Sequence, residues 1–277
     1  MTAVNLKALL TRANRNNYSV AGLVVISWED AIAYTEAAHE TNIPIILQAG
    51  PSCRQYTPVS ILGKMFRHLA EQTKTPICCH LDHGFSYDEC IEGIESGFTS
   101  VMFDGSKLPL NKNIRISSKI SKIAHKHNIS VEGEVGIVGY HNGNTSFGTD
   151  IDEAKKFSLE SGVDAMAISV GNTHLQKSKI AKIDYNKILK IQKISKLPLV
   201  LHGSSGINSS MRKKIARNTK VAKFNIGTEL RITACNSLRK SYNKKKSSFD
   251  KIEIIKPSII ELKSHTIKII KNIGPIQ

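Results

Sequence analysis

Three histidines, His83, His174 and His202, follow short apolar runs that read ICCHLDHG, AMAISVGNTH and LPLVLHGSSG. Catalytic zinc sites use three protein ligands and leave one coordination position open, and neutral imidazole is a common ligand in them. One histidine at the end of a strand is more often structural than metal-binding. Three of them, beside the acidic residue Asp82 and glycine-rich turns, predict a catalytic metal site.

The elements that must bring these histidines together alternate regularly along the chain. Short β-rich runs are separated by amphipathic stretches such as residues 31–41, 112–128 and 185–195. This alternation predicts a single-domain (β/α)8 TIM barrel. Active sites of that fold lie at the carboxyl ends of the strands, and the histidines follow the third, sixth and seventh runs. The runs expected to form strands are residues 19–26, 45–48, 77–81, 100–103, 130–135, 165–168, 199–201 and 221–226.

The length of 277 residues suits one barrel domain over residues 1–277, with a C-terminal helical segment at about 229–277. A hydrophobic fraction of 40% is enough for a large core. The sequence has no apolar run of about eighteen residues and no apolar stretch typical of a signal peptide near its start, so we expect no membrane segment. Five cysteines without a C-x-x-C pair indicate reduced thiols. Together these features predict a cytoplasmic protein.

The net charge of +16 raises the question of nucleic-acid binding, and residues 239–251, RKSYNKKKSSFDK, form the densest basic patch. The lysines are nevertheless spread through the whole chain, without interleaved aromatic residues. Compositional bias on solvated faces explains them better than a nucleic-acid partner does. A positive field also concentrates anionic substrates such as sugar phosphates.

The motifs HLDHG, VEGEVG, GNTH, LVLHGSSG and FNIGTEL, in this order and spacing, resemble the class II (zinc-dependent) ketose-bisphosphate aldolases, specifically the tagatose/fructose-bisphosphate branch. The resemblance extends from the N-terminal helix to the C-terminal helices. It implies a lyase of carbohydrate metabolism, as in glycolysis. Such an enzyme reversibly cleaves a ketose 1,6-bisphosphate, or a related ketose 1-phosphate, into dihydroxyacetone phosphate and an aldehyde through a metal-stabilised enediolate.

The resemblance also assigns roles to the residues around the histidines. One Zn²⁺ per subunit would be held by His83, His174 and His202, and Asp82 would be the catalytic acid/base. The alternative for Asp82 is to orient His80 or His83.

The phosphate half of the site is expected after the seventh and eighth runs, where barrels commonly build phosphate sites from backbone N–H groups and helix N-termini. By resemblance, Asn225 also contacts the ketone-bearing carbons. The same residues are also compatible with ordinary βα turns and helix caps. The residues expected to bind substrate are Gly203, Ser204, Ser205, Asn225, Ile226, Gly227 and Thr228.

Two further acids, Asp104 in FDGS and Glu134 in VEGEVG, end the fourth and fifth runs. By resemblance they balance the charge of the metal or offer it a second position. A buried hydrogen-bonding role with nearby histidines explains them equally well. Glu132 lies two residues before Glu134 and is expected to point to the same side of the strand.

The chain departs from the family pattern at several positions. Val24 stands where relatives carry asparagine, and Gly50 stands where they carry serine or threonine; both positions serve the aldehyde half of the substrate. Leu175 replaces a glycine where the backbone closely approaches substrate or a monovalent cation, a second ion that the resemblance implies. A one-residue deletion there would make Lys177 a weak candidate for phosphate contact.

The loop at residues 137–148, IVGYHNGNTSFG, lacks the carboxylate that relatives often use for proton exchange, and Tyr140 or His141 are the available substitutes. Its glycines suit a lid over the substrate. Loss of that carboxylate would equally explain slow turnover, whereas the departures at Val24 and Gly50 leave the aldehyde half of the substrate undetermined.

Two other classes of function stay open at this point. One is a metal-dependent barrel with a changed reaction, such as an epimerase or a lyase for another phosphorylated sugar. The other is a non-catalytic protein that binds a sugar phosphate or nucleic acid. Relatives assemble as homodimers or homotetramers through outer helices, and residues 249–273 carry apolar residues at helical intervals suited to such packing.

Overall fold

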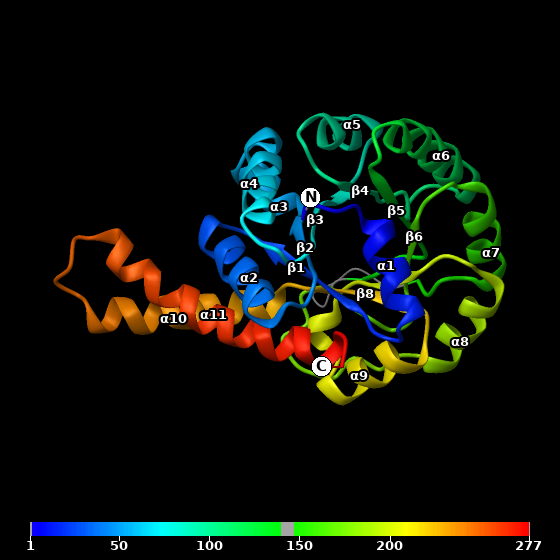
Figure 1. Ribbon diagram of the computed structural model, residues 1–277. Coiled ribbons are helices and arrows are strands. Elements are labelled where there is room, and N and C mark those ends of the chain that lie inside the picture. Colours follow the sequence, from blue (N-terminus) through cyan, green and yellow to red (C-terminus); the bar gives the residue numbers. More distant parts are fainter. Residues whose placement is uncertain (1, 140–146, 277) are drawn as a thin grey trace.

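The computed structural model describes residues 2–139 and 147–276, and its centre is a closed barrel of eight parallel strands (Figure 1). Each strand pairs with its neighbours in chain order, and β8 closes the barrel against β1. The predicted TIM-barrel class is therefore confirmed. The strands are β1 Val20–Val25, β2 Ile45–Ala49, β3 Ile77–Gly84, β4 Ser100–Phe103, β5 Ser130–Val135, β6 Ala165–Ile168, β7 Leu199–Leu201 and β8 Val221–Ile226.

Helices surround the barrel and bury its outer face, so both faces of every strand are covered (Figure 1). Side chains that accept hydrogen bonds cap the N-termini of several of these helices. The Asp150 side chain, for example, accepts hydrogen bonds from the backbone N–H groups of Asp152 and Glu153. The helices are α1 Leu6–Arg15, α2 Trp28–Thr41, α3 Pro51–Tyr56, α4 Val59–Glu71, α5 Tyr87–Glu95, α6 Leu110–Lys126, α7 Ile151–Glu160, α8 Tyr185–Ile194, η1 Ser204–Gly206, α9 Ser209–Asn218, α10 Thr228–Lys244 and α11 Lys251–Ile273.

The interior of the barrel is apolar at one end and polar at the other. Helix α1 covers the amino end, where its leucines pack with inward residues such as Ile46 and Cys78. Two residues further along the same strands, Gln48 and His80 are buried polar groups. Because side chains two residues apart on a strand face the same side, the apolar layer at the amino end of the barrel is followed directly by a polar layer nearer its carboxyl end.

Helices α10 and α11 pack against each other as a hairpin that projects beyond the barrel (Figure 1). The basic segment at residues 239–251 lies at the tip of this hairpin, and the lower part of α11 packs against α2. No helix in the described part of the chain has the length and apolar character needed to span a membrane.

A buried ion pair crosses the polar layer of the barrel. Lys223 Nζ lies 2.6 Å from Glu132 Oε2 and 3.2 Å from His80 Nε2, and all three side chains are fully buried. Burial alone would raise the pKa of Glu132, but the charge of Lys223 and the hydrogen bond with His202 hold that pKa well below its usual range. Burial, reinforced by Lys223, lowers the pKa of His80 to about 3. His80 is thus neutral and accepts a hydrogen bond from the ammonium group.

Replacing Lys223 by methionine should lower the free energy of unfolding by about 3 kcal/mol, because Glu132 would lose its cationic partner while still buried. Lys220→Met, at an exposed lysine just before the same strand, is the matched control and should change stability by less than about 0.5 kcal/mol. Urea unfolding followed by circular dichroism measures both. Equal stabilities of the two variants would contradict the role given to the pair.

Candidate metal centre and active site

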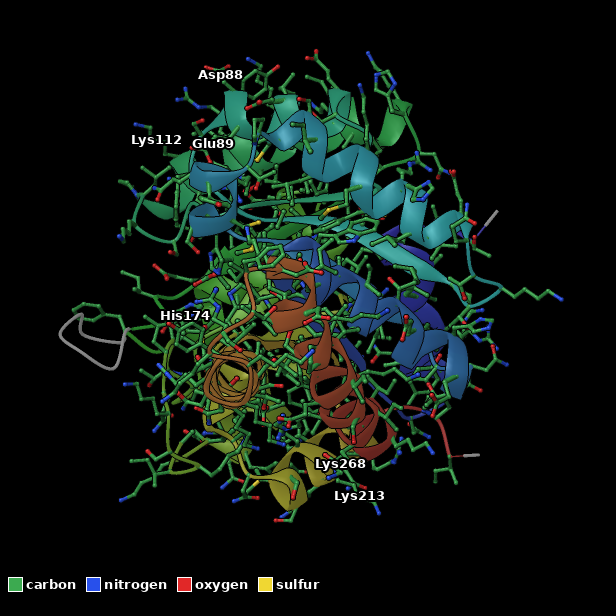
Figure 2. All side chains as sticks on the ribbon, turned by 90° about the vertical axis from the view of Figure 1, so that its left-hand side faces the viewer. Asp88, Glu89, Lys112, His174, Lys213 and Lys268 are labelled. Carbon is green, nitrogen blue, oxygen red and sulfur yellow. The ribbon has the colours of Figure 1, made fainter. Side chains whose placement is uncertain are left out.

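The three predicted histidines converge at the carboxyl end of the barrel. His83 is the penultimate residue of β3, His202 directly follows β7, and His174 lies in the loop after β6. The ring centroid of His83 is 4.6 Å from that of His202 and 5.3 Å from that of His174. One ligand nitrogen from each histidine lies within 4.8 Å of the other two. Figure 2 shows His174 and Glu89 on the same side of the barrel.

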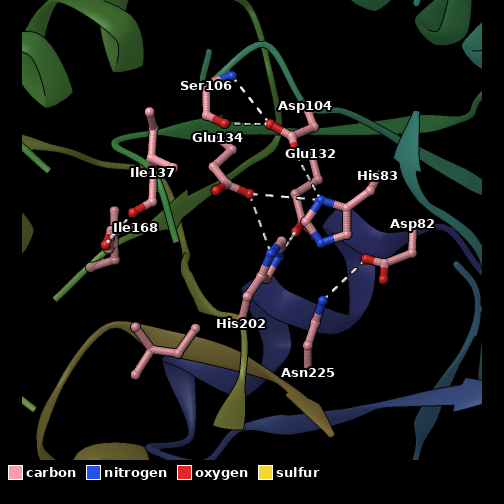
Figure 3. Close-up of polar contacts among 12 residues, drawn as sticks. Asp82, His83, Asp104, Ser106, Glu132, Glu134, Ile137, Ile168, His202 and Asn225 are labelled. Atoms are coloured by element: carbon pink, nitrogen blue, oxygen red, sulfur yellow. Dashed lines mark hydrogen bonds and ion pairs between the residues drawn. The ribbon is translucent and has the colours of Figure 1, made fainter. Parts of the chain in front are cut away.

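Carboxylates orient two of these rings (Figure 3). His83 Nδ1 is 2.8 Å from Asp104 Oδ2, and His202 Nε2 is 3.0 Å from Glu132 Oε1. Asp104 is itself held by the hydroxyl of Ser106, at 2.6 Å. A carboxylate bonded to one imidazole nitrogen selects the tautomer and leaves the second nitrogen for a metal. The free nitrogens are then His83 Nε2 and His202 Nδ1.

The residues present fit a divalent metal ion. His202 Nδ1 and Glu134 Oε2 are both buried and form an ion pair at 3.3 Å, yet neither atom has a hydrogen bond among the described residues. Buried polar atoms without hydrogen bonds are costly, and a cation bound to both would satisfy them. His83, Asp104 and Glu134 form a second group whose ligand atoms lie within 4.8 Å of one another. Nitrogen and carboxylate oxygen donors suit zinc.

The histidines differ in charge because their neighbours differ. Burial lowers the pKa of His174 to about 3, with His83 contributing in the same direction. Burial also opposes protonation of His202, but Glu132 and Glu134 outweigh it and raise its pKa to about 10. Metal binding requires neutral imidazole, so occupancy of this site would displace a proton from His202.

Asp82 is nearly fully buried beside the histidines. Its Oδ1 accepts hydrogen bonds from Gln48 Nε2 at 2.8 Å and from Asn225 Nδ2 at 3.1 Å. Burial alone would raise the pKa of Asp82, but His83 and then Lys223 outweigh it and hold the pKa near 2. The carboxylate is therefore ionised. Its other oxygen, Oδ2, faces Gly50, where a Cβ would lie 3.9 Å away.

A cavity of about 400 Å³ opens above Asp82 and contains many of the predicted site residues. Ser204 and Ile226 are fully buried and are not among its lining residues, and the Ser204 hydroxyl instead donates to the Leu201 carbonyl. Lys177 is exposed and also does not line the cavity. The predicted site residues that do line it are Asp82, His83, His174, Gly203, Ser205, Asn225, Gly227 and Thr228.

Close packing joins the two loops expected to hold phosphate to the loop that carries His174. Gly203 has φ +59°, and a Cβ there would lie 2.3 Å from the carbonyl oxygen of Thr173, so only glycine fits. Ser205 Oγ accepts a hydrogen bond from the Glu229 amide at 3.2 Å. Glu229 in turn pairs with Lys179, which lies further along the loop after His174. These contacts leave little freedom in the backbone around the cavity.

The three substitutions noted in the sequence all line this cavity. Val24 packs on Gly227, where a Cβ would lie 3.1 Å from Val24 Cγ2, and Gly50 lies across from Asp82. Leu175 adopts φ +57°, a left-handed conformation that is costly for a residue with a Cβ. Val24 and Gly50 thus lack the polar side chains that relatives are expected to carry, and Leu175 adds a side chain where they carry glycine.

Several residues of the site are not predicted from the sequence motifs. Gln48 is one of them, although it lies two residues after inward-facing Ile46. Arg231 lines the cavity one helical turn after Gly227, and Arg54 lies at the corresponding place in α3. A cation one turn into a helix that follows a barrel strand was the signal available for both. Tyr140 and His141, the expected substitutes for a loop carboxylate, lie outside the described residues.

Comparisons with known proteins agree over nearly the whole chain. The family described as "Fructose-bisphosphate aldolase class-II" matches residues 4–276. A 6-phospho-5-dehydro-2-deoxy-D-gluconate aldolase from Shouchella clausii is 31% identical, over 99% of this chain and 95% of that protein. A fructose-bisphosphate aldolase from Mycoplasma genitalium is 39% identical, over 86% of this chain and 84% of that protein. The crystal structure of the YdjI aldolase from Escherichia coli K12 superposes with a TM-score of 0.85, at 25% identity, covering 98% and 97% of the two chains.

Proposed function

The chain belongs to the class II fructose-bisphosphate aldolase family of carbon–carbon lyases, and from this premise we propose a specific reaction for it. The enzyme reversibly cleaves a ketose 1,6-bisphosphate of the fructose or tagatose type, or a related ketose 1-phosphate, into dihydroxyacetone phosphate and an aldehyde. The family implies a phosphorylated sugar substrate and a divalent metal. An epimerase and a non-catalytic binding protein, both open from sequence, do not fit a family of lyases.

One observation carries this proposal, namely the convergence of three histidine nitrogens beside the ionised carboxylate of Asp82. His83, His174 and His202 would hold one Zn²⁺. When bound, the metal supplies a Lewis acid that stabilises negative charge next to the ketone of the substrate. The chain's own residues must then bind the substrate, orient it and move one proton.

Asp82 is suited to that proton transfer. Gln48 and Asn225 both hold its Oδ1, so the side chain has one orientation and Oδ2 is directed toward the cavity. In cleavage, Oδ2 accepts the proton of the substrate hydroxyl as that carbon becomes the aldehyde carbonyl. In synthesis the same oxygen returns the proton. The low pKa of Asp82 is consistent with a base that is ionised before substrate arrives.

The substrate phosphate is assigned to the loops after β7 and β8. Gly203 and Ser205 after β7 line the cavity, and so do Gly227 and Thr228 at the start of α10. Backbone N–H groups at a helix N-terminus attract anions. This arrangement supports dihydroxyacetone phosphate as the half of the substrate common to all candidates.

A second candidate substrate follows from the acceptor side of the cavity. The S. clausii relative is named for a six-carbon sugar acid with a ketone at carbon 5 and a phosphate at carbon 6. Cleavage of that acid between carbons 3 and 4 would release dihydroxyacetone phosphate and a three-carbon aldehyde with a carboxylate. The apolar contact of Val24 with Gly227 suits an acceptor with few hydroxyls, and Arg231 offers a cation to its anionic end.

Assembly and location belong to the same proposal. We expect a homodimer or homotetramer that packs through outer helices, since α11 exposes Ile252 and Ile260, each 71% accessible. A cytoplasmic location accords with five free cysteines. Sedimentation of the purified protein measures the assembly directly.

The deciding assay is cleavage of a substrate panel by the zinc-loaded protein, with release of dihydroxyacetone phosphate coupled to its reduction. The panel contains ketose 1-phosphates, fructose and tagatose 1,6-bisphosphates and 6-phospho-5-dehydro-2-deoxygluconate. We expect release that a chelator abolishes and added zinc restores, and the best substrate identifies the acceptor. Zinc-loaded protein that releases dihydroxyacetone phosphate from none of these would refute the proposed reaction.

Asp82→Ala should lower kcat by about a hundredfold or more while zinc content stays near that of the wild type, because the proton acceptor is lost and the ligands remain. Asp88→Ala, at an exposed acid on α5, is the control and should retain full activity. Steady-state kinetics and metal analysis provide the two measurements. Unchanged turnover in Asp82→Ala would assign proton transfer to another group.

His202→Ala should lose both zinc and activity, since three protein ligands are the minimum for this site. His68→Ala, at an exposed histidine on α4, should keep both. Metal content after gel filtration is the measurement, with circular dichroism to confirm folding. A folded His202→Ala protein that retains stoichiometric zinc would remove His202 from the ligand set.

A further inference from the structure

Arg54 joins three separate segments at the edge of the site. It lies in α3, yet its side chain is only 8% exposed and extends to the end of β3. Nη1 donates to the carbonyl oxygens of Ala49 at 2.7 Å and Asp82 at 2.5 Å. Nη2 donates to the carbonyl oxygen of His83 at 2.9 Å and to Glu89 Oε2 at 3.1 Å. One guanidinium therefore binds the backbone of two adjacent residues of the candidate site.

The backbone that Arg54 holds is in an unfavourable conformation. His83 has φ +52°, in the left-handed region, which is unfavourable for a residue with a Cβ. Such conformations persist only where the surrounding structure imposes them. His83 is also the candidate metal ligand whose ring direction depends most directly on this turn.

The β-sheet does not impose that conformation. The pairing of β3 with β2 ends at Leu81, and the register with β4 shifts between Leu81 and Gly84. Asp82 and His83 thus fall in the gap of the ladder. The guanidinium of Arg54 supplies hydrogen bonds to both of their carbonyl oxygens at the place where the sheet supplies no pairing.

Charge and shape both suit Arg54 to this task. Arginine stays ionised when buried and presents its donors in a rigid planar fork. Glu89, at the start of α5, provides the balancing carboxylate and also accepts from the Phe85 amide that follows the turn. A lysine offers one ammonium group, which does not match two parallel pairs of acceptors.

We infer that Arg54 is a positioning residue that holds the Asp82–His83 turn, so that His83 points to the other two histidines and Asp82 points into the cavity. Arg54 does not touch the reacting atoms. The inference rests on the proposed metal site. If Arg54 only anchored α3 to the barrel, its loss would reduce stability without a specific effect on the geometry of the metal ligands.

The test compares Arg54→Met with Arg54→Lys and with the control Arg67→Met. Arg67, on α4, likewise donates to a backbone carbonyl, that of Gly97 at 2.9 Å, but it lies away from the site. The measurements are zinc affinity by competition with a chromophoric chelator, the absorption spectrum of the Co²⁺-loaded protein, and urea unfolding of the metal-free protein.

We expect Arg54→Met to weaken zinc affinity by about ten- to a hundredfold, the range typical for loss of a group that orients a metal ligand. Its Co²⁺ spectrum should also shift, whereas Arg67→Met should match the wild type in both measurements. Arg54→Lys should fall between them, which keeps the test available if Arg54→Met does not fold. Wild-type affinity and spectrum in Arg54→Met, or in Arg54→Lys where only that variant folds, would overturn the inference.

Measurements on the wild-type protein separate a failure of the proposed metal site from a failure of the role given to Arg54. If the wild-type protein itself bound no zinc and gave no Co²⁺ spectrum of a protein-bound ion, the proposed metal site would be refuted, and so would the positioning role of Arg54. If the wild type bound zinc and the Arg54 variants bound it equally well, only the positioning role would be wrong.

Discussion

The carboxylate of Glu132 joins the interior of the barrel to the histidine cluster, and much of the site depends on it. One oxygen pairs with Lys223 and the other with His202, and none of the three side chains is exposed to solvent. A buried charge is tolerated only when it is paired and hydrogen-bonded. Glu132 meets that condition by linking β5 to Lys223 of β8 and to His202 directly after β7, and it thereby sets the orientation of a candidate metal ligand.

The charges around the cavity are organised in the same way. Asp82, Asp104 and Glu132 are held ionised by cationic or hydrogen-bonding neighbours, which outweigh the cost of burial. Glu134 differs, because burial and the nearby charge of Asp104 raise its pKa. Lys223 and a protonated His202 balance part of this negative charge. A divalent cation among the three histidines would replace the proton on His202 and balance the remainder.

The cavity must hold both halves of a substrate. The loops after β7 and β8, which line it with Gly203, Ser205, Gly227 and Thr228, are the ones we propose for the phosphate half. Val24, Leu175 and the cation of Arg231 line the same cavity. Because a retro-aldol step needs the same groups at the ketone whatever aldehyde leaves, we expect the substitutions at Val24 and Gly50 to alter the choice of acceptor without changing the chemistry.

The amino-acid sequence by itself determined the barrel and the histidine site. Runs 100–103, 130–135, 165–168, 199–201 and 221–226 are strands at the predicted residues, because short apolar β-rich runs between amphipathic stretches form the buried strands of parallel sheets. The site followed, since parallel strands of a closed barrel bring their carboxyl ends to one rim.

Only the tertiary structure decided how the rim is held. Local preference does not predict the left-handed turn at His83, which is stabilised by Arg54 from another segment. Local preference also does not predict that Gln48 of β2 holds Asp82 of β3, or that Lys223 of β8 holds Glu132 of β5. Such contacts join residues far apart in the chain, and their energy outweighs local cost only once the barrel has closed.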